Sequence, residues 1–289
     1  RDADSFRWGF TSLSLLGGMR PADVAWYRLG DPGWFATDGW SLTPETAGMA
    51  RLMGKGPHLG PITAYVRRRP EATQLLIGGR NLGAEDGPPA TFSVAIDDRP
   101  LDSWSAGPGF FVRTVTIPDG ALAGAGRWAA LTVQSSAGTA APVPTAIEQF
   151  DLQSPGVLMW AYGAGFHEPE LDNSRARSWR WMSEHATIAV PQTGGDVTLV
   201  VRGESPLTYF DKPSTLEVRS GEALLGRVEL TGDFEVRIGV LAARLAATHA
   251  IELTTTQTFA PAERGRSGDH RRLGLRLFAV DFLPGTATR

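Results

Sequence analysis

Two tryptophans, an arginine and a glutamate lie within six residues of one another in the second half of the chain. They are Trp179, Arg180, Trp181 and Glu184. A sugar ring presents an apolar C–H face that stacks on an indole, and its hydroxyl groups need planar polar partners such as carboxylates and guanidinium groups. This segment supplies both kinds of group. It predicts a carbohydrate-binding site in which Trp179, Arg180 and Glu184 contact the ligand.

The same spacing also fits a strand that packs in a protein interior. Along a strand, Trp179 and Trp181 would share one face and Arg180 would take the other. Core packing therefore competes with ligand stacking for both indoles, and more so for Trp181, because Trp179 is nearer a loop. Trp34 and Trp40, in the first half of the chain, are further candidates for ligand contact.

An acidic segment precedes the second pair of tryptophans. Residues 167–173 read His-Glu-Pro-Glu-Leu-Asp-Asn, and we expect them to form a loop. His167, Glu168 and Glu170 could contact sugar hydroxyls, the carboxylates could hold Ca²⁺ through oxygen ligands, or the loop could be solvated or make structural hydrogen bonds. No second histidine follows at the spacing of a metalloprotease helix. We therefore expect no cofactor, with Ca²⁺ as the alternative.

Paired carboxylates could instead hydrolyse a glycosidic bond, which requires two acids about 5–9.5 Å apart. Glu184 with Glu168 or Glu170 is the possible pair. Against this interpretation, the Glu184 position recurs in the first half as Glu45, whereas the acids of the loop occur once. A repeated glutamate more often pairs with a repeated arginine inside a sandwich. The candidate arginines are Arg113 and Arg237.

Other catalytic signatures are absent from the sequence. It has no Gly-x-Ser-x-Gly elbow, no phosphate-binding Gly-rich loop followed by Lys and no dinucleotide-binding fingerprint. The absence of cysteine excludes a thiolate nucleophile and a Cys-ligated zinc. The glycine-rich residues 78–83 lead into a polar loop and predict a strand end and a turn. A net charge of −3 argues against a nucleic-acid partner.

The candidate residues belong to a chain that repeats itself. The pattern Trp-x-apolar-x-x-Glu-x-Ala occurs at residues 40–47 and again at 179–186. The two copies are 139 positions apart, and a repeat unit of about this length fits two homologous domains in tandem. We expect an N-terminal arm or extra strand at 1–23, a first domain at 24–153 and a second domain at 154–285. A linker is predicted at 135–144, although 147–152 could still be the last strand of the first domain.

Short apolar-alternating runs separated by turn residues predict strands along most of the chain. The chain contains 34 Gly and 20 Pro, which at this spacing favour a sandwich over βαβ units. Helix is expected only at 121–125 and 241–247. The sequence therefore predicts an all-β protein of two tandem jelly-roll-like antiparallel β-sandwich domains with very little helix. The clearest predicted strands are 94–96, 112–117, 196–202, 215–219, 225–230, 234–240 and 272–282.

Six segments spread over residues 24–282 match one known region when they are taken together. They are Tyr27-Arg28-Leu29-Gly30-Asp31-Pro32-Gly33-Trp34-Phe35, Gly78-Gly79-Arg80-Asn81-Leu82-Gly83, Gly165-Phe166-His167-Glu168-Pro169-Glu170, Ser178-Trp179-Arg180-Trp181-Met182-Ser183-Glu184, Phe259-Ala260-Pro261-Ala262-Glu263 and Arg271-Arg272-Leu273-Gly274-Leu275. The chain thereby resembles the non-membrane C-terminal part of bacterial multi-spanning glycosyltransferase-like proteins, where similar segments follow the last transmembrane helix.

The resemblance implies a pair of modules similar to carbohydrate-binding modules, located in the periplasm and attached to the inner membrane in the parent protein. Catalysis would belong to the membrane portion, so this region is not expected to be an enzyme. The implied partners are a glycan or lipid-linked sugar and the membrane-embedded domain. The first copy has Ser41-Leu42 where the second has Arg180-Trp181, and it lacks the His-Glu-Pro-Glu segment. The second copy is therefore the favoured binder.

Three functional hypotheses follow. The first is a non-catalytic carbohydrate-binding tandem module that is accessory to a membrane glycosyltransferase. The second is a structural or interaction module that packs on a membrane partner without binding sugar; the arginine-rich loop at 263–272 could face a partner domain or phospholipid headgroups. The third is a glycoside hydrolase. An exposed aromatic side chain on a concave face, with Asp, Glu or Arg at its rim, would favour the first hypothesis. Fully buried tryptophans and a large exposed apolar patch would favour the second. The third requires two convergent carboxylates in a cleft.

Overall fold

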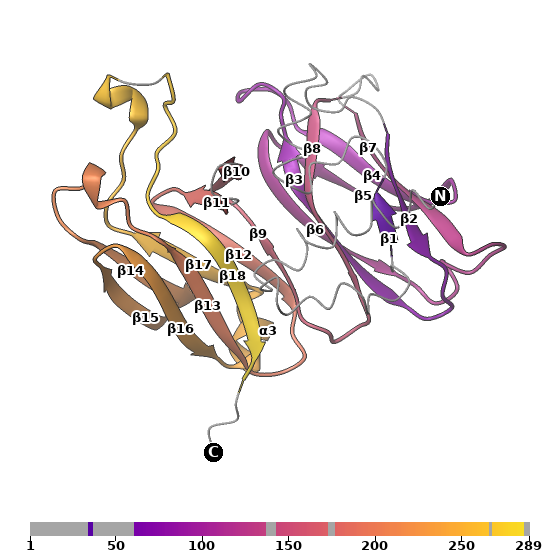
Figure 1. The fold of residues 1–289 in the computed structure, drawn as a ribbon. Coiled ribbons are helices and arrows are strands. Elements are labelled where there is room, and N and C mark those ends of the chain that lie inside the picture. Colours follow the sequence, from indigo (N-terminus) through magenta and orange to yellow (C-terminus); the bar gives the residue numbers. More distant parts are fainter. Residues whose placement is uncertain (1–33, 37–60, 137–142, 173–176, 266–267, 286–289) are drawn as a thin grey trace. The chain divides into compact units, whose positions relative to one another are not determined.

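The computed structural model describes residues 34–36, 61–136, 143–172, 177–265 and 268–285. The chain divides into two compact units, residues 1–155 and 156–289. Antiparallel strands make up most of the described part of both units, and helix is limited to short segments (Figure 1). The prediction of an all-β fold of antiparallel sandwiches with very little helix is confirmed.

The first unit contains two sheets. A five-stranded sheet has the order β1-β2-β7-β4-β5, and a three-stranded sheet has the order β6-β3-β8. Their strands are β1 (Trp34–Ala36), β2 (Ile62–Arg67), β3 (Thr73–Asn81), β4 (Ala90–Ile96), β5 (Arg99–Ala106), β6 (Gly109–Ile117), β7 (Trp128–Ser136) and β8 (Thr145–Gln153).

One hydrophobic core joins these two sheets. Buried and more exposed residues alternate along β2 and β4, so each strand directs one face inward. Phe92 from β4 meets Leu75 and Ile77 from β3 and Phe150 from β8 in this core. Full burial of side chains of this size stabilises a fold by about 1.5–3 kcal/mol each.

Local sequence explains the turns of the first unit. Asp97 and Asp98, between β4 and β5, have φ of 47° and 62°. Positive φ at both central residues is what a two-residue type I′ hairpin requires. The helix expected at 121–125 is instead a turn and a bend, because Gly120, just before this stretch, and Gly124, within it, adopt φ of 77° and 155°.

The predicted linker at 135–144 lies within the first unit. Residues up to Ser136 belong to β7, and the strand that follows, β8, pairs with β3 along its length. Ser135 is buried, and its hydroxyl donates a hydrogen bond to the carbonyl oxygen of Val143 at 3.0 Å. This stretch therefore connects two strands of one sandwich, which agrees with the alternative that 147–152 form the last strand of the first copy.

The second unit also contains two sheets, which lie face to face (Figure 1). One has the order β10-β11-β18-β13-β16, and the other has the order β15-β14-β17-β12-β9. Their strands are β9 (Met159–Tyr162), β10 (Phe166–Asp172), β11 (Arg177–Met182), β12 (His185–Gln192), β13 (Val197–Glu204), β14 (Ser214–Ser220), β15 (Ala223–Leu230), β16 (Asp233–Val240), β17 (Ala250–Thr255) and β18 (Arg276–Pro284).

Three short helical segments accompany these strands in the described part of the second unit. They are the 3₁₀ turns η3 (Leu207–Tyr209) and η4 (Pro261–Arg264) and the helix α3 (Ala242–Thr248). The helix predicted at 241–247 is α3. The strand predicted at 272–282 begins only at Arg276, because residues 272–275 belong to the loop after η4, where Phe259 and Leu273 form an isolated bridge.

The acidic segment at 167–173 is not a loop, as its sequence suggested, but largely an edge strand. Residues up to Asp172 belong to β10, which pairs with β11 and carries an irregular register between Phe166 and Pro169. Proline lacks the backbone N–H group that a central strand needs, and an edge strand with a bulge accommodates it. The pairing of β10 with β11 fixes where Glu168 and Glu170 lie relative to the tryptophans of β11.

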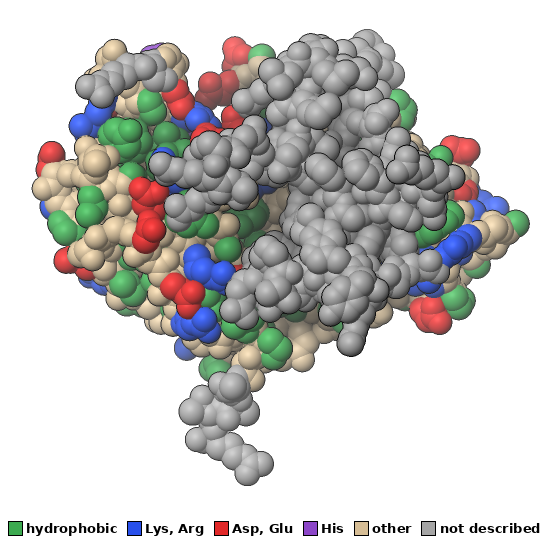
Figure 2. Space-filling view, in the orientation of Figure 1, with side chains coloured by type: hydrophobic (Ala, Val, Ile, Leu, Met, Phe, Trp, Pro, Cys, Tyr) green, Lys and Arg blue, Asp and Glu red, His purple; other side chains and the backbone are tan. Residues whose placement is uncertain are grey.

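No helix among the described residues is long and apolar enough to cross a membrane. On the visible face of these residues, acidic and basic side chains are intermixed with hydrophobic ones (Figure 2).

Candidate functional site

The two tryptophans of β11 lie on the same face of their sheet. Trp181 is opposite Arg276 of β18 in the strand register, and Glu204 of β13 is also opposite Arg276. Residues opposite one another in a sheet, and residues two apart in one strand, point to the same face. Trp179, Trp181, Arg276 and Glu204 therefore form one row across three strands.

Arg276 fixes the two indoles. Its guanidinium carbon lies 4.9 Å from the ring centroid of Trp179 and 4.6 Å from that of Trp181. Its Nη1 donates a hydrogen bond to Glu204 Oε2 at 3.0 Å. A cation over an indole is attracted by the negative face of the ring, most strongly where water is partly excluded. Arg276 and Glu204 thus hold both rings in defined orientations.

The two indoles differ in their exposure. Trp181 is 5% exposed and packs with Phe259 and Leu273 in a small cluster, which we call the aromatic cluster. Trp179 packs against the edge of this cluster and is only half-buried. Trp181 therefore packs in the interior, which is the alternative to ligand stacking that its place on a strand predicted. Trp179 is the indole of β11 that retains accessible surface.

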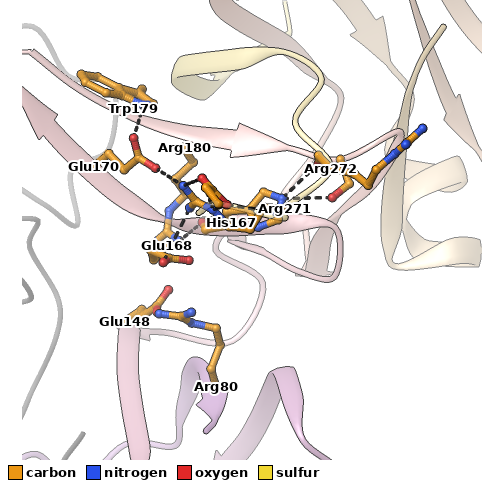
Figure 3. Close-up of polar contacts among 11 residues, drawn as sticks. Arg80, Glu148, His167, Glu168, Glu170, Trp179, Arg180, Arg271 and Arg272 are labelled. Atoms are coloured by element: carbon orange, nitrogen blue, oxygen red, sulfur yellow. Dashed lines mark hydrogen bonds and ion pairs between the residues drawn. The ribbon is translucent and has the colours of Figure 1, made fainter. Parts of the chain in front are cut away.

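A hydrogen bond to β10 orients Trp179 further. Glu170 is opposite Trp179 in the register of β10 and β11, and the indole Nε1 donates to Glu170 Oε2 at 3.1 Å (Figure 3). The ring is consequently held at its nitrogen by a carboxylate and at its face by a guanidinium.

Three carboxylates surround one arginine beside this tryptophan. Arg271 pairs with Glu170 at 2.9 Å, with Asp269 at 2.7 Å and with Glu168 at 3.6 Å (Figure 3). Hydrogen bonding to Arg271 lowers the pKa of Asp269 to about 2, and the same contact with Asp269 raises the pKa of Arg271 above its ordinary value. Three acidic side chains thus share one guanidinium group in this cluster.

His167 connects the start of β10 to the loop that carries Arg271. Its Nε2 lies 3.1 Å from Ser183 Oγ and 3.3 Å from the carbonyl oxygen of Arg272. Burial lowers the pKa of His167. A neutral imidazole at this position links two segments of the chain.

Arg180 points to the opposite face from the tryptophans. It is 8% exposed, its Nη1 donates to the carbonyl oxygen of His167 at 3.0 Å, and its guanidinium carbon lies 5.0 Å from the ring centroid of Tyr162. Burial raises the pKa of Tyr162 to about 12, so its hydroxyl stays protonated. These contacts place Arg180 among internal structural groups.

Glu184 lies apart from these contacts, between β11 and β12. Its side chain is 63% exposed, and its carboxylate is 3.8 Å from the imidazole of His185. The expectation that Glu184 pairs with Arg237 is wrong, because Arg237 pairs with Glu235 at 2.7 Å. The exposed β11–β12 turn keeps Glu184 away from the sheet face on which Arg237 lies.

The candidates in the first unit have other surroundings. Arg113, the proposed partner of Glu45, pairs with Asp102 at 2.8 Å. Trp34 is half-buried on β1 and packs against the first core, with its ring centroid 4.6 Å from that of Phe150. Trp40 and Glu45 lie outside the described residues.

The site that the structure assembles thus consists of Trp179 with Glu170, Arg271 and Arg276 around it. The sequence indicated Trp179 and Glu170 but not the two arginines. Arg271 was placed only within an arginine-rich loop, and Arg276 was counted as part of a strand. No group of three or more His, Cys, Asp or Glu in the described part of the chain is arranged to hold a metal ion.

Comparisons with known proteins give limited information. No family model matches the chain, and no curated protein matches it. The N-terminal CBM22-1-CBM22-2 tandem domain from Paenibacillus barcinonensis Xyn10C is 10% identical, with 89% of this chain and 95% of that chain covered and a TM-score of 0.25.

Two further solved structures are matched over a smaller share of their own length. A GH2 beta-galacturonidase from Eisenbergiella tayi is 14% identical over 63% of this chain and 29% of its own, with a TM-score of 0.24. The M60 catalytic domain with CBM51-1 and CBM51-2 domains from Clostridium perfringens ZmpB is 8% identical over 76% and 33%, with a TM-score of 0.23. At these identities and TM-scores, the matches identify neither a family nor a ligand.

Proposed function

We propose that the second unit binds carbohydrate without transforming it, with the indole of Trp179 as the surface on which a sugar ring stacks. The observation that carries the proposal is that Trp179 is partly exposed yet held by two separate contacts, from Glu170 and Arg276. An aromatic ring fixed in this way loses little conformational freedom when a ligand binds, which favours affinity.

The charged groups around the ring suit hydroxyl recognition. Each carboxylate has about four lone-pair positions, and Glu170 accepts one hydrogen bond from Trp179 and one from Arg271. The remaining lone pairs can accept hydrogen bonds from sugar hydroxyls. Sites for small ligands commonly combine one apolar surface with a few polar groups that fix orientation.

A binding role fits the carboxylates better than a hydrolytic one. Glycoside hydrolysis needs two carboxyl groups, one that acts as a general acid and one that acts as a nucleophile or a base. Glu168 and Glu170 are instead both engaged by the same guanidinium group, that of Arg271.

The resemblance to the C-terminal part of bacterial multi-spanning glycosyltransferase-like proteins supports a wider proposal about where the chain acts. We propose that the chain is the periplasmic part of an inner-membrane glycosyltransferase-like protein. There it would hold a glycan or a lipid-linked sugar and lie against the membrane-embedded domain.

A glycan-array screen tests the proposal. The purified chain is compared with Trp179→Ala and with Trp128→Ala, which removes a half-buried tryptophan of the first unit that likewise has arginines over its ring. Binding that is lost in Trp179→Ala and kept in Trp128→Ala supports the proposal, provided that both variants remain folded by circular dichroism. A folded chain that binds no glycan would favour the structural module instead.

A further inference from the structure

A second partly exposed ring lies at the far side of the aromatic cluster. Tyr209 of η3 stacks on Phe259, with ring centroids 4.2 Å apart and an interplanar angle of 12°. Phe259 is only 6% exposed, whereas Tyr209 is 40% exposed. One face of the Tyr209 ring is therefore backed by a buried ring, and the residue still presents surface to solvent.

Tyr209 and Trp179 are connected through buried rings. Trp181 packs edge-on against Phe259, with ring centroids 5.8 Å apart, and Trp179 packs against the same cluster. The sequence of rings is Trp179, Trp181, Phe259 and Tyr209. Because the two middle rings are buried, the accessible aromatic surface of this series lies at its two ends.

The backbone around Tyr209 is also held. Its amide donates to the carbonyl oxygen of Pro206 at 2.9 Å, and its own carbonyl oxygen accepts a hydrogen bond from Arg264 Nη2 at 2.7 Å. The contact with Arg264 ties η3 to η4, two turns that are far apart in the sequence. Asp211 and Lys212, both exposed, follow in the same loop and supply an acceptor and a donor of hydrogen bonds.

We propose that Tyr209 is a second stacking position for the ligand of the Trp179 site, and that this ligand is an oligosaccharide and not a single sugar. The inference rests on the proposed carbohydrate-binding function. Two buried rings separate the accessible ones, so a ligand that contacts both must extend beyond one sugar ring. A flat ring with one backed face offers a sugar the same kind of surface as Trp179.

Calorimetric titration with ligands of increasing length tests the inference. The probes are gluco-, manno- and galacto-oligosaccharides of one to six units, titrated into the unaltered chain and three variants. Tyr209→Leu removes the flat ring but keeps an apolar cover over Phe259, and Tyr209→Phe keeps the ring. Leu207→Ala, on the same turn and 39% exposed, is the matched control for loss of exposed apolar surface.

The unaltered chain, Tyr209→Phe and Leu207→Ala should bind longer probes more tightly than shorter ones, by on the order of tenfold. Tyr209→Leu should lose this gain while its affinity for the shortest bound probe changes less than twofold. An equal gain with length in Tyr209→Leu, confirmed as folded by its thermal unfolding, would overturn the inference and leave the Trp179 site intact. Absence of binding by the unaltered chain at every length would overturn both.

Discussion

The guanidinium group of Arg276 lies against the indole of Trp179, with its carbon 4.9 Å from the ring centroid. The arginine occupies one face of the ring, so a ligand that stacks on Trp179 must use the opposite face. Arg276 reaches Trp179 from β18, the strand next to β11, and its hydrogen bond to Glu204 on β13 fixes it there. Three neighbouring strands thus determine the position of one aromatic ring.

Replacing Arg276 by Gln should lower the free energy of unfolding by about 1–2 kcal/mol. The change removes a cation that interacts with two rings and leaves Glu204 without its ion-pair partner. Urea unfolding measures the effect. The control is Arg237→Gln, which breaks a pair whose arginine is 58% exposed and should cost less than about 0.5 kcal/mol. Equal losses in the two variants would contradict the account of Arg276.

Replacing Arg271 by Ala should destabilise the second unit by roughly 1–2 kcal/mol, since three part-exposed carboxylates are left to repel one another. The loss should shrink at high salt, which screens the repulsion. Unfolding in low and high salt measures this difference. Arg272→Ala is the neighbouring control, because its pair with Glu263 at 3.9 Å is mostly exposed. A loss that salt leaves unchanged would show that packing, not charge, is the contribution of Arg271.

Acidification should weaken the fold through His167. Burial lowers the pKa of this imidazole in the folded state, so the unfolded chain takes up its proton first as the pH falls below about 6.5. The stability that the neutral imidazole contributes is therefore present above this pH and is lost below it. Unfolding free energies at pH 8 and pH 5, compared between the unaltered chain and His167→Gln, isolate the effect. The variant should show the smaller decrease, and a larger decrease would reverse the sign of the argument.

Gly165, just before β10, should not tolerate a side chain. Its φ is 83°, and a Cβ atom there would collide with the carbonyl oxygen of His185. Gly165→Ala is expected to cost more than about 3 kcal/mol, because backbone strain and a steric clash add together. Gly120→Ala is the matched control: its φ is 77°, but nothing lies near its Cβ position, so it should cost about 1 kcal/mol. Similar unfolding midpoints for the two variants would argue against a tight turn at Gly165.

The parts of the fold that could be predicted best from the sequence are those determined by residues close together in the chain. The strands β14 and β16 alternate regularly between more buried and more exposed residues, and Gly-containing turns separate both of them from β15, so the local pattern located all three strands. The local pattern did not predict β10, because its proline and its charged residues have a low propensity for strands. β10 is an edge strand that is stabilised by its pairing with β11.

The site was predictable only in part, for a related reason. Trp179 and Glu170 are of types suited to sugar binding and lie close together in the chain. Arg271 is 101 residues from Glu170, and nothing local indicates that the two meet. The expected pairing of Glu184 with Arg237 was wrong for the same reason, since a repeated residue type does not fix which face of a sheet it occupies.

Nuclear magnetic resonance of the tryptophan indole N–H groups shows directly whether a glycan binds at Trp179. The chain has nine tryptophans, and the resonance of Trp179 is identified by its absence in Trp179→Phe. Titration with a glycan retained on the array should shift this resonance saturably, while the resonance of Trp128, assigned in the same way, should stay in place. If a glycan binds and the Trp179 resonance does not move, the sugar is not bound at Trp179 and the proposed site is wrong.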